Sequence, residues 1–316
     1  MPTYAIGVPT RFRGLTERQG MVWRGAAGWA EWSPFLDYDG AELVPWLRAA
    51  DEASDQGWPP PVRTVVEVNS TIPAVGPEQA FGSARAAGCR TAKVKVAAPG
   101  GLLSEDLARV EAVRDALGPN GRVRIDANGA WSVEQAESAI RQLSRFGLEY
   151  VEQPCRTVEE MAELRRRLAR AGVEVLVAAD ESIRRAEDPL RVSRCGAADV
   201  AVLKVQPLGG VRASLEIAER IGLPVVVSSA LETSIGLRAG LALAAALPEL
   251  PYACGLNTVG LLAGDLASPP LAATDGVITL REVAVDPAAL ERHRADPAVE
   301  QFWQARLVRT RRLTSG

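Results

Sequence analysis

Histidine is nearly absent from this sequence of 316 residues, since only His293 is a histidine. One histidine excludes zinc sites of the HExxH type, which need two, and it argues against a histidine general base. Cysteine is also scarce. The four cysteines are widely scattered and form no CxxC pair: Cys89, Cys155, Cys195 and Cys254. We therefore expect free thiols and a reduced, cytoplasmic compartment.

A surplus of positive charge and a long apolar run are missing as well. The chain has 36 basic and 39 acidic residues, a net charge of -3, so we expect no nucleic-acid partner. The longest nearly uncharged stretch, 233–248, is shorter than the roughly 20 residues of a membrane span and contains Arg238. We expect a buried helix there and no membrane partner. No signal peptide is visible at the N-terminus.

What the sequence does contain is a repeated alternation of apolar, β-branched runs with helical stretches. The runs are 62–68, 91–96, 122–125, 148–151, 173–178, 200–205, 223–227 and 252–256. Alternation of this kind, at about 25–30 residues per unit, predicts parallel strands with right-handed crossovers. Eight strands in about 200 residues favour a closed, TIM-type β/α barrel over an open sheet. No GxGxxG follows the first run.

The two ends of the chain break this repeat. Residues 22–24 and 28–32 resemble short antiparallel strands, 41–53 has helical spacing, and prolines 59–61 mark a boundary. After residue 265 we expect a strand at 277–280 and a helix at 287–294, packed on the N-terminal segment. Two capping boxes are visible within the repeat, Ser132 with Gln135 and Thr157 with Glu160. The predicted parts are thus 1–60, a barrel at 61–265, and 266–316.

Ionisable residues lie at the ends of five successive predicted strands. They are Lys93 and Lys95, Asp126, Glu152, Asp180, and Lys204. Strands of a parallel barrel are buried on both faces, so a charge there is unfavourable unless it is paired or bound to a metal. The carboxyl ends of barrel strands face one mouth, where active sites are built. We therefore expect these side chains to meet in one cavity.

The three carboxylates predict a metal site. Asp126, Glu152 and Asp180 are one unit apart, and hard oxygen ligands suit Mg²⁺. A lysine near a divalent cation and a second lysine should have a lowered pKa and can act as a base. The cation would stabilise the negative charge formed when a proton beside a carboxylate is removed. The pattern predicts an enzyme acting on a small-molecule carboxylate.

Other interpretations remain open at this point. Any one of these carboxylates could be a helix cap or an ion-pair partner. Strand alternation points Glu181 away from the cavity, and Asp265 has no assigned role. A Schiff-base aldolase could use Lys204, although it would leave the three carboxylates unexplained. A barrel that only binds ligands is a further possibility.

Three segments resemble the enolase superfamily, in its muconate-lactonizing subgroup, and within it the o-succinylbenzoate synthases. They are 122–131 (RVRIDANGAW), 228–236 (SSALETSIG) and 255–258 (GLNT). The resemblance covers about residues 62–265. It implies that 1–60 and 266–316 together form an α+β capping domain over the barrel.

The resemblance also implies roles for single residues. Lys95 would remove the alpha proton and help hydroxide leave, Lys204 would stabilise the enediolate, and Lys93 would tune Lys95. The implied ligands of Mg²⁺, or of Mn²⁺ in its place, are Asp126, Glu152 and Asp180. The implied substrate-binding or supporting residues are Lys93, Arg124, Asn128, Ser229, Leu231 and Gly255.

The implied reaction is the dehydration of 2-succinyl-6-hydroxy-2,4-cyclohexadiene-1-carboxylate to 2-succinylbenzoate, in menaquinone biosynthesis. N-acylamino acid racemase, of the same subgroup, is an alternative because it uses the same metal and two lysines. A dipeptide epimerase usually has Asp-x-Asp after the eighth strand, and 254–258 reads CGLNT instead. Loops 12–15 and 34–38 would cover the substrate. The sequence gives no oligomeric state.

Overall fold

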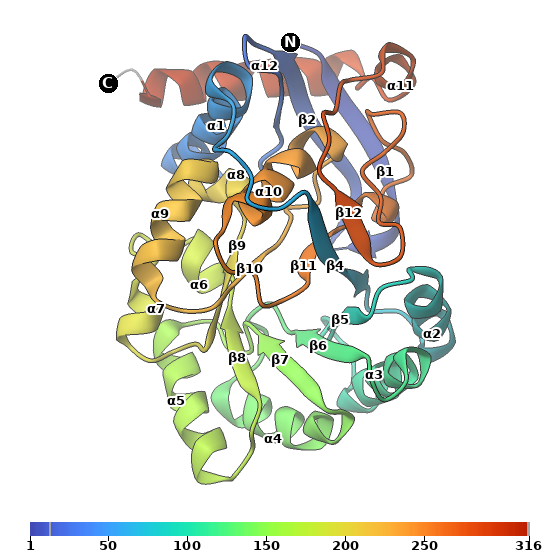
Figure 1. Cartoon of the computed structure of the whole chain (residues 1–316), viewed down its shortest axis with the longest axis vertical. Coiled ribbons are helices and arrows are strands. Elements are labelled where there is room, and N and C mark those ends of the chain that lie inside the picture. The colour runs from blue at the N-terminus through green and yellow to red at the C-terminus, as the bar shows by residue number, and fades with distance from the viewer. Residues whose placement is uncertain (13, 315–316) are drawn as a thin grey trace.

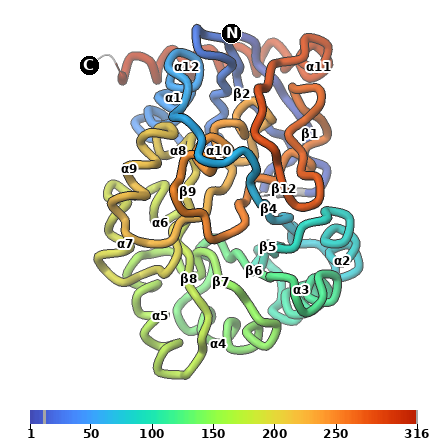
Figure 2. The backbone as a smooth tube through the Cα atoms, in the orientation of Figure 1, coloured from blue at the N-terminus to red at the C-terminus, as the bar shows by residue number. Residues whose placement is uncertain are grey.

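The computed structural model describes residues 1–12 and 14–314, without the side chains of residues 11 and 12 (Figure 1). A small antiparallel sheet and several helices lie at one end of the molecule, and a ring of parallel strands surrounded by helices forms the rest (Figure 1). The first strand of the chain and the last helix, residues 297–314, lie at the end that holds the antiparallel sheet (Figure 2). The first and last parts of the chain are therefore neighbours.

Eight parallel strands form the ring, and each matches one predicted run. They are β4 (Val65–Ile72), β5 (Thr91–Lys95), β6 (Arg122–Asp126), β7 (Leu148–Glu152), β8 (Leu176–Ala179), β9 (Val200–Leu203), β10 (Val225–Val227) and β11 (Cys254–Asn257). Neighbours pair in the order β10-β9-β8-β7-β6-β5-β4-β11, and a parallel bridge between Ser228 and Gly255 joins the two ends. The predicted closed α/β barrel is confirmed.

Several predicted strand limits are wrong, and three of them have a clear local reason. The first strand begins at Val65 because Val62 lies outside the sheet, where its amide bonds to the carbonyl of Ala245. The fifth begins at Leu176 because the amide of Val173 still closes the preceding helix. The sixth ends at Leu203, since the next residues form the short helix α8 (Val205–Leu208).

Helices and short turns connect the strands. They are α2 (Pro77–Ala86), α3 (Leu103–Leu117), α4 (Val133–Leu143), η3 (Ser144–Phe146), α5 (Val158–Arg170), α6 (Glu181–Arg184), α7 (Arg191–Arg194), α9 (Val211–Ile221), α10 (Ser234–Ala246) and η4 (Val259–Leu261). Both predicted capping boxes are present, at the starts of α4 and α5. Helix α10 is buried along most of its length, as expected for 233–248. Within the described ranges, no helix combines the length and apolar character that crossing a membrane requires.

The N-terminal part contributes the antiparallel sheet. Its strands are β1 (Thr3–Phe12), β2 (Leu15–Arg24) and β3 (Trp29–Trp32), and the turn η1 (Gly40–Glu42), helix α1 (Leu43–Asp51) and π-helical turn η2 (Glu52–Gln56) follow. The sheet order is β1-β2-β3. Helix α1 packs on α8, at the end of the barrel where β9 finishes. The N-terminal part therefore covers the carboxyl ends of the barrel strands.

The C-terminal segment returns to both parts. It contains β12 (Val277–Thr279), which pairs antiparallel with β4, then α11 (Pro287–Arg292) and α12 (Pro297–Thr314). Helix α12 was not predicted from the sequence, because its buried side chains mix Trp303 and Leu307 with Arg306 and Thr310 and so form no apolar stripe. The Trp303 ring packs edge-on against Trp32, 5.5 Å between centroids. The domain limits 1–60, 61–265 and 266–316 stay a prediction.

Candidate active site

The register of neighbouring strands brings the charged strand ends together. Lys95 lies opposite Asp126 in the β5–β6 pair, and Asp126 lies opposite Glu152 in the β6–β7 pair. Residues two apart in a strand point to the same face, so Lys93 and Lys95 share one side. That side is the barrel interior, where Lys93, Asp126 and Glu152 are almost completely buried.

Two lysines hold the carboxylates of β6 and β7. Lys93 Nζ lies 2.7 Å from both carboxylate oxygens of Glu152 and 3.3 Å from Asp126 Oδ2. Lys95 Nζ lies 2.5 Å from Asp126 Oδ2 and 2.8 Å from Asn128 Oδ1. The Lys95 side chain is 16% exposed against 7% for Lys93, so Lys95 is the amine nearer the open end of the barrel.

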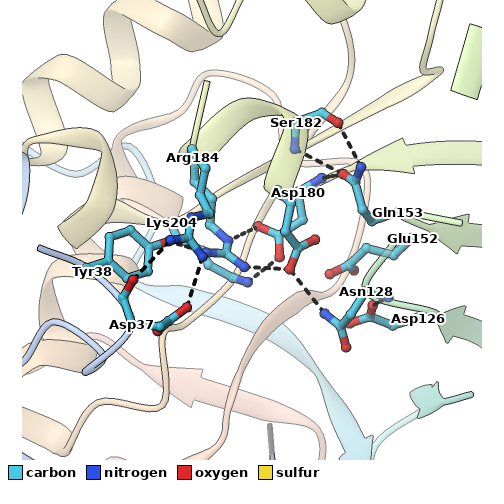
Figure 3. A network of polar contacts seen from close by, with 12 residues as sticks. Asp37, Tyr38, Asp126, Asn128, Glu152, Gln153, Asp180, Ser182, Arg184 and Lys204 are labelled. Carbon is cyan, nitrogen blue, oxygen red and sulfur yellow. Dashed lines mark hydrogen bonds and ion pairs between the residues drawn. The ribbon is translucent and has the colours of Figure 1, made fainter. Parts of the chain in front are cut away.

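Lys204 and Arg184 hold Asp180 in a similar way. Lys204 Nζ lies 2.5 Å from Asp180 Oδ2, and Arg184 Nε lies 2.9 Å from Asp180 Oδ1. Arg184 also donates to Glu181 Oε1 at 2.5 Å and to the hydroxyl of Tyr38. Figure 3 shows Arg184 between Tyr38 and Asp180. This arginine therefore joins the loop after β3 to the mouth of the barrel.

A chain of polar contacts connects the two sides of the mouth. Lys95 donates to the Asn128 carbonyl, and the Asn128 amide donates to Glu181 Oε1 at 3.2 Å. Arg184 continues the chain from Glu181 to the carboxylate that Lys204 contacts. Lys95 and Lys204 are thus held in one connected network.

The buried charges shift one another's pKa. Burial and the carboxylate of Asp126 raise the pKa of Glu152 to about 7. Burial would also raise the pKa of Asp126 and Asp180, but the neighbouring cations lower both. Burial lowers the pKa of Lys204, whereas the carboxylates beside Lys93 outweigh burial and raise its pKa. The charge of Arg184 also lowers the pKa of Lys204, so the carboxylates around this amine do not outweigh its burial.

A small cavity opens above these groups. Its lining includes Phe35, Thr71, Lys93, Lys95, Asp126, Asn128, Arg184, Lys204, Ser229, Leu231, Gly255 and Thr258. The structure therefore brings most of the predicted site residues to one cavity. Glu152 and Asp180 are completely buried beside it, where Lys93 and Lys204 contact them.

Three of the predicted residues form the cavity wall on the side of β10 and β11. Ser229 Oγ lies 2.7 Å from Thr258 Oγ1 and accepts a bond from the Leu231 amide at 3.3 Å. A Cβ added to Gly255 would lie 2.6 Å from Ser228 Oγ, so glycine allows the two strands to close the barrel. The wall depends on this close approach.

One of the two predicted covering loops reaches the cavity. Loop 34–38 contributes Phe35 to the cavity lining. In loop 12–15, Arg13 and the side chain of Phe12 lie outside the described residues.

Arg124 does not lie at this cavity. It is two residues before Asp126 on the same face of β6, deeper in the barrel, where its side chain is completely buried. Its Nε lies 2.5 Å from Glu149 Oε2, and its Nη1 donates to Asn69 Oδ1 at 3.1 Å. Its guanidinium carbon lies 4.7 Å from the centre of the Tyr150 ring. These contacts link Arg124 to the barrel interior.

The carboxylates fit a divalent cation in chemistry. Asp126, Glu152 and Asp180 offer hard oxygen donors from three adjacent strand ends, which is the ligand type of Mg²⁺. Across the described residues, no group of three or more His, Cys, Asp or Glu side chains is arranged to hold a metal ion. The lysine amines supply the positive charge instead. The metal-ligand set stays a prediction.

Two features of this site were not predicted from the sequence. The first is Gln153. This side chain is completely buried, and its Oε1 accepts bonds from the amides of Asp180 and Ser182 at 3.0 and 3.1 Å, so it holds the end of β8 in place.

The second feature is the composition of the basic residues. Lys93, Lys95 and Lys204 are the only lysines in the chain, and every other basic residue counted is arginine. Arginine stays protonated in proteins, so the side-chain amines that can exchange protons are confined to this cavity.

Backbone strain is concentrated at the same mouth. Five described non-glycine residues have a positive φ, and four of them follow barrel strands there: Ala97, Asn128, Gln153 and Leu231. Such conformations are unfavourable for residues with a side chain and cluster at functional sites. The strain supports a functional interpretation of this end.

Family models and solved structures show what this chain is similar to. A model described as enolase C-terminal domain-like matches residues 77–284, and one described as enolase N-terminal domain-like matches 3–54. The muconate lactonizing enzyme from Pseudomonas putida superposes with a TM-score of 0.77 at 20% identity, over 93% of this chain and 98% of that one. The N-succinyl Arg/Lys racemase from Bacillus cereus gives a TM-score of 0.78 at 17% identity, over 93% and 96%.

Curated relatives are much more similar in sequence. An o-succinylbenzoate synthase from Thermobifida fusca is 61% identical over 98% of this chain and 95% of its own length. The o-succinylbenzoate synthase of Mycobacterium tuberculosis is 50% identical over 95% and 90%. Identity of this extent, together with the domain matches, means that the chain belongs to the o-succinylbenzoate synthase family of the enolase superfamily.

Proposed function

We propose that this chain dehydrates 2-succinyl-6-hydroxy-2,4-cyclohexadiene-1-carboxylate to 2-succinylbenzoate, as a carbon–oxygen lyase. The observation that carries the proposal is that Lys95 and Lys204 line one cavity from opposite sides. Lys95 ends β5 and Lys204 follows β9, four strands away in a ring of eight. A substrate carbon between them would have a base on one side and a cation on the other. Membership of the synthase family supports this reaction.

Lys95, as a neutral amine, would remove the proton alpha to the substrate carboxylate. The electrons of the C–H bond pass into the carboxylate, and a negative charge develops there. The C–O bond to the ring hydroxyl then breaks, the proton returns from Lys95, and water leaves. The ring becomes aromatic, which drives the reaction. Asp126 and Asn128, at 2.5 and 2.8 Å from Nζ, would orient Lys95 for both proton transfers.

Lys204 would remain an ammonium and stabilise the negative charge on the substrate carboxylate. Its partner Asp180 is fixed by Arg184, so the cation is oriented before the substrate arrives. Lys93 would stay beside Glu152 and keep positive charge close to Lys95.

Asp126, Glu152 and Asp180 would hold Mg²⁺, or Mn²⁺ in its place. When bound, the ion supplies positive charge for the substrate carboxylate. Burial, and after it the charge of Asp126, raises the pKa of Glu152. A divalent cation would relieve the repulsion between these two carboxylates, which supports the assignment.

We also propose that the enzyme acts in menaquinone biosynthesis and in the cytoplasm. The first proposal follows from the product named for its relatives, o-succinylbenzoate. The second follows from the cysteines, all four of which have free thiols.

An absorbance assay tests the proposed function. The purified protein is stripped of metal with a chelator, and loss of the cyclohexadiene absorbance is followed with and without added Mg²⁺. We expect turnover only with the divalent ion. The Thermobifida fusca relative serves as the positive control. If that control is active and this chain shows no turnover at any metal concentration, the proposal is overturned.

A second candidate activity is racemisation of N-acylamino acids. The placement of Lys95 and Lys204 on both sides of the cavity favours it, because racemisation needs a proton donor and an acceptor on opposite faces of one carbon. One enantiomer of an N-succinylamino acid is incubated in deuterated water. Deuterium at the alpha carbon together with loss of optical activity would establish this reaction.

A further inference from the structure

Arg18 connects the antiparallel sheet to the barrel mouth. It lies on β2 and is only 2% exposed. Its Nε donates to the carbonyl of Leu231 at 3.0 Å, and its Nη2 donates to the carbonyl of Ala230 at 3.2 Å. Both acceptors belong to the loop between β10 and α10. A residue of the N-terminal sheet thus fixes the backbone of the loop that forms one cavity wall.

The same guanidinium also holds the loop after β3. Nη2 donates to the carbonyl of Ser33 and to Ser33 Oγ, the latter at 2.9 Å. The guanidinium carbon lies 4.6 Å from the centre of the Phe35 ring. Phe35 and Leu231 both line the cavity. Arg18 therefore stands behind two neighbouring parts of the wall and touches each of them.

The loop that Arg18 holds is strained. Leu231 has a φ of 60°, a left-handed conformation that is unfavourable for a side chain of this size. Strained residues persist only where surrounding contacts determine their conformation. For Leu231 these contacts include the bond from Arg18 to its carbonyl and the bond from its own amide to Ser229 Oγ.

We propose that Arg18 is a positioning residue that sets the substrate specificity of this cavity by fixing the wall formed by Phe35 and Leu231. The inference rests on the proposed function and on the family resemblance, which implies that Leu231 borders the succinyl group of the substrate. Arg18 acts through these two residues and touches no reacting atom. The N-terminal sheet thereby takes part in recognition.

The geometry requires the fork of an arginine. The guanidinium carries five N–H donors in a fixed plane and also stacks on an aromatic ring, whereas a lysine ammonium concentrates three donors at one point. Arg18 uses the plane to reach Leu231, Ala230 and Ser33 while its face contacts Phe35. Lysine at this position could not serve both loops.

The test compares Arg18→Met and Arg18→Lys with a matched control, Arg114→Met. Arg114 also bonds backbone carbonyls, those of Phe146, Gly118, Gly121 and Gly147, but it does not line the cavity. We measure kcat and KM, and by calorimetry with Mg²⁺ the Kd values of 2-succinylbenzoate and of benzoate, which lacks the succinyl arm. Both Arg18 variants should raise KM and the Kd of 2-succinylbenzoate roughly tenfold or more. The kcat and the Kd of benzoate should change less than about threefold.

Several results would overturn the inference. One is an unchanged KM in both Arg18 variants. Another is an equal loss of affinity for both ligands, which would indicate a purely structural role. A parent protein that neither turns over the substrate nor binds 2-succinylbenzoate overturns the proposed function instead.

If the Arg18 variants do not fold, a second variant, Phe35→Leu, removes the stacked ring and keeps the cation of Arg18. It should then raise KM roughly threefold, and an unchanged KM would refute the inference.

Discussion

The barrel buries charged side chains at two depths, and the two layers differ in how many charges they hold and in what those charges contact. At the mouth, strands β6 and β7 and the residues after β8 and β9 present Asp126, Glu152, Asp180 and Lys204. Two residues earlier, the same inner faces carry Arg124, Tyr150, Ala178 and Val202. The deeper layer is thus apolar or aromatic except for a single arginine.

Each charge at the mouth has partners that a substrate or a cation could replace. Lys95 and Lys204 contact carboxylates and also line the cavity. The deeper charge, that of Arg124, has no contact with the cavity. Arg124 is paired with Glu149 and lies against the rings of Tyr150 and Tyr252, at 4.7 and 5.7 Å.

Burial of a charge therefore does not by itself indicate a catalytic role. Buried ion pairs also occur as structural elements, and breaking one is destabilising because a charge is left without its partner. What separates the two depths is access to the cavity. We therefore expect substitutions at the mouth to reduce activity and substitutions at the deeper layer to reduce stability.

The largest effect should come from the lysines at the mouth. Lys95→Ala and Lys204→Ala should each lower kcat by at least about 10²–10⁴-fold, because each removes a proton-transfer group or a stabilising cation. Folding should remain intact, since Lys95 is partly exposed and the shortened side chains leave room for water. Steady-state kinetics measures the kcat of each variant, and thermal unfolding of the same samples tests whether the variant is folded. Wild-type turnover of Lys95→Ala would contradict the assignment of the base.

The second effect concerns the carboxylates of the mouth. Asp180→Asn keeps the shape of the side chain but removes one negative charge of the proposed ligand set. We expect the concentration of Mg²⁺ needed for half-maximal activity to rise by roughly tenfold or more. Direct titration with Mn²⁺, followed by its magnetic resonance signal, should show the same loss of affinity without any turnover. Unchanged Mn²⁺ binding would remove Asp180 from the ligand set.

The mouth was the most predictable part of the molecule. Strand ends could be located because β-branched runs alternate with helices, and the charges stand out because they interrupt apolar runs. The family resemblance then assigned roles to Lys95 and Lys204. The restriction of lysine to this site was present in the composition and would have strengthened the prediction.

The deeper layer and the junction with the N-terminal sheet could not be predicted in the same way. Arg124 differs from Asp126 by only two positions on one strand, and its partner Glu149 turns inward only because the β6–β7 register shifts there. Arg18 and Leu231 are 213 residues apart. Periodicity describes only local structure, so it says nothing about such pairs.

The third effect tests the deeper layer. Arg124→Met removes the cation and leaves Glu149 without it, so the free energy of unfolding should fall by about 3–5 kcal/mol. The kcat of the folded fraction should change less than about threefold, since Arg124 does not line the cavity. Urea unfolding and kinetics at low temperature measure the two quantities. A large loss of kcat at unchanged stability would instead support a direct supporting role in the reaction.

The smallest effect should come from Glu232, a buried carboxyl beside the cavity wall. Burial and the nearby Glu31 raise its pKa to about 7, and its Oε2 accepts a bond from the Ala230 amide. Between pH 4.5 and pH 7 the folded state keeps a proton that the unfolded state has released, so the stabilisation present at lower pH is lost as pH rises. Glu232→Gln should be free of this loss, because glutamine does not titrate.

The free energy of unfolding of the Glu232→Gln variant, relative to that of the parent protein, should therefore increase from pH 5 to pH 8 by at most about 3 kcal/mol. Glu282→Gln, at a side chain that is 86% exposed, is the control and should show no such trend. A pH-independent difference for Glu232→Gln would mean that this carboxyl titrates normally and that only the charges around the lysines are perturbed at the mouth.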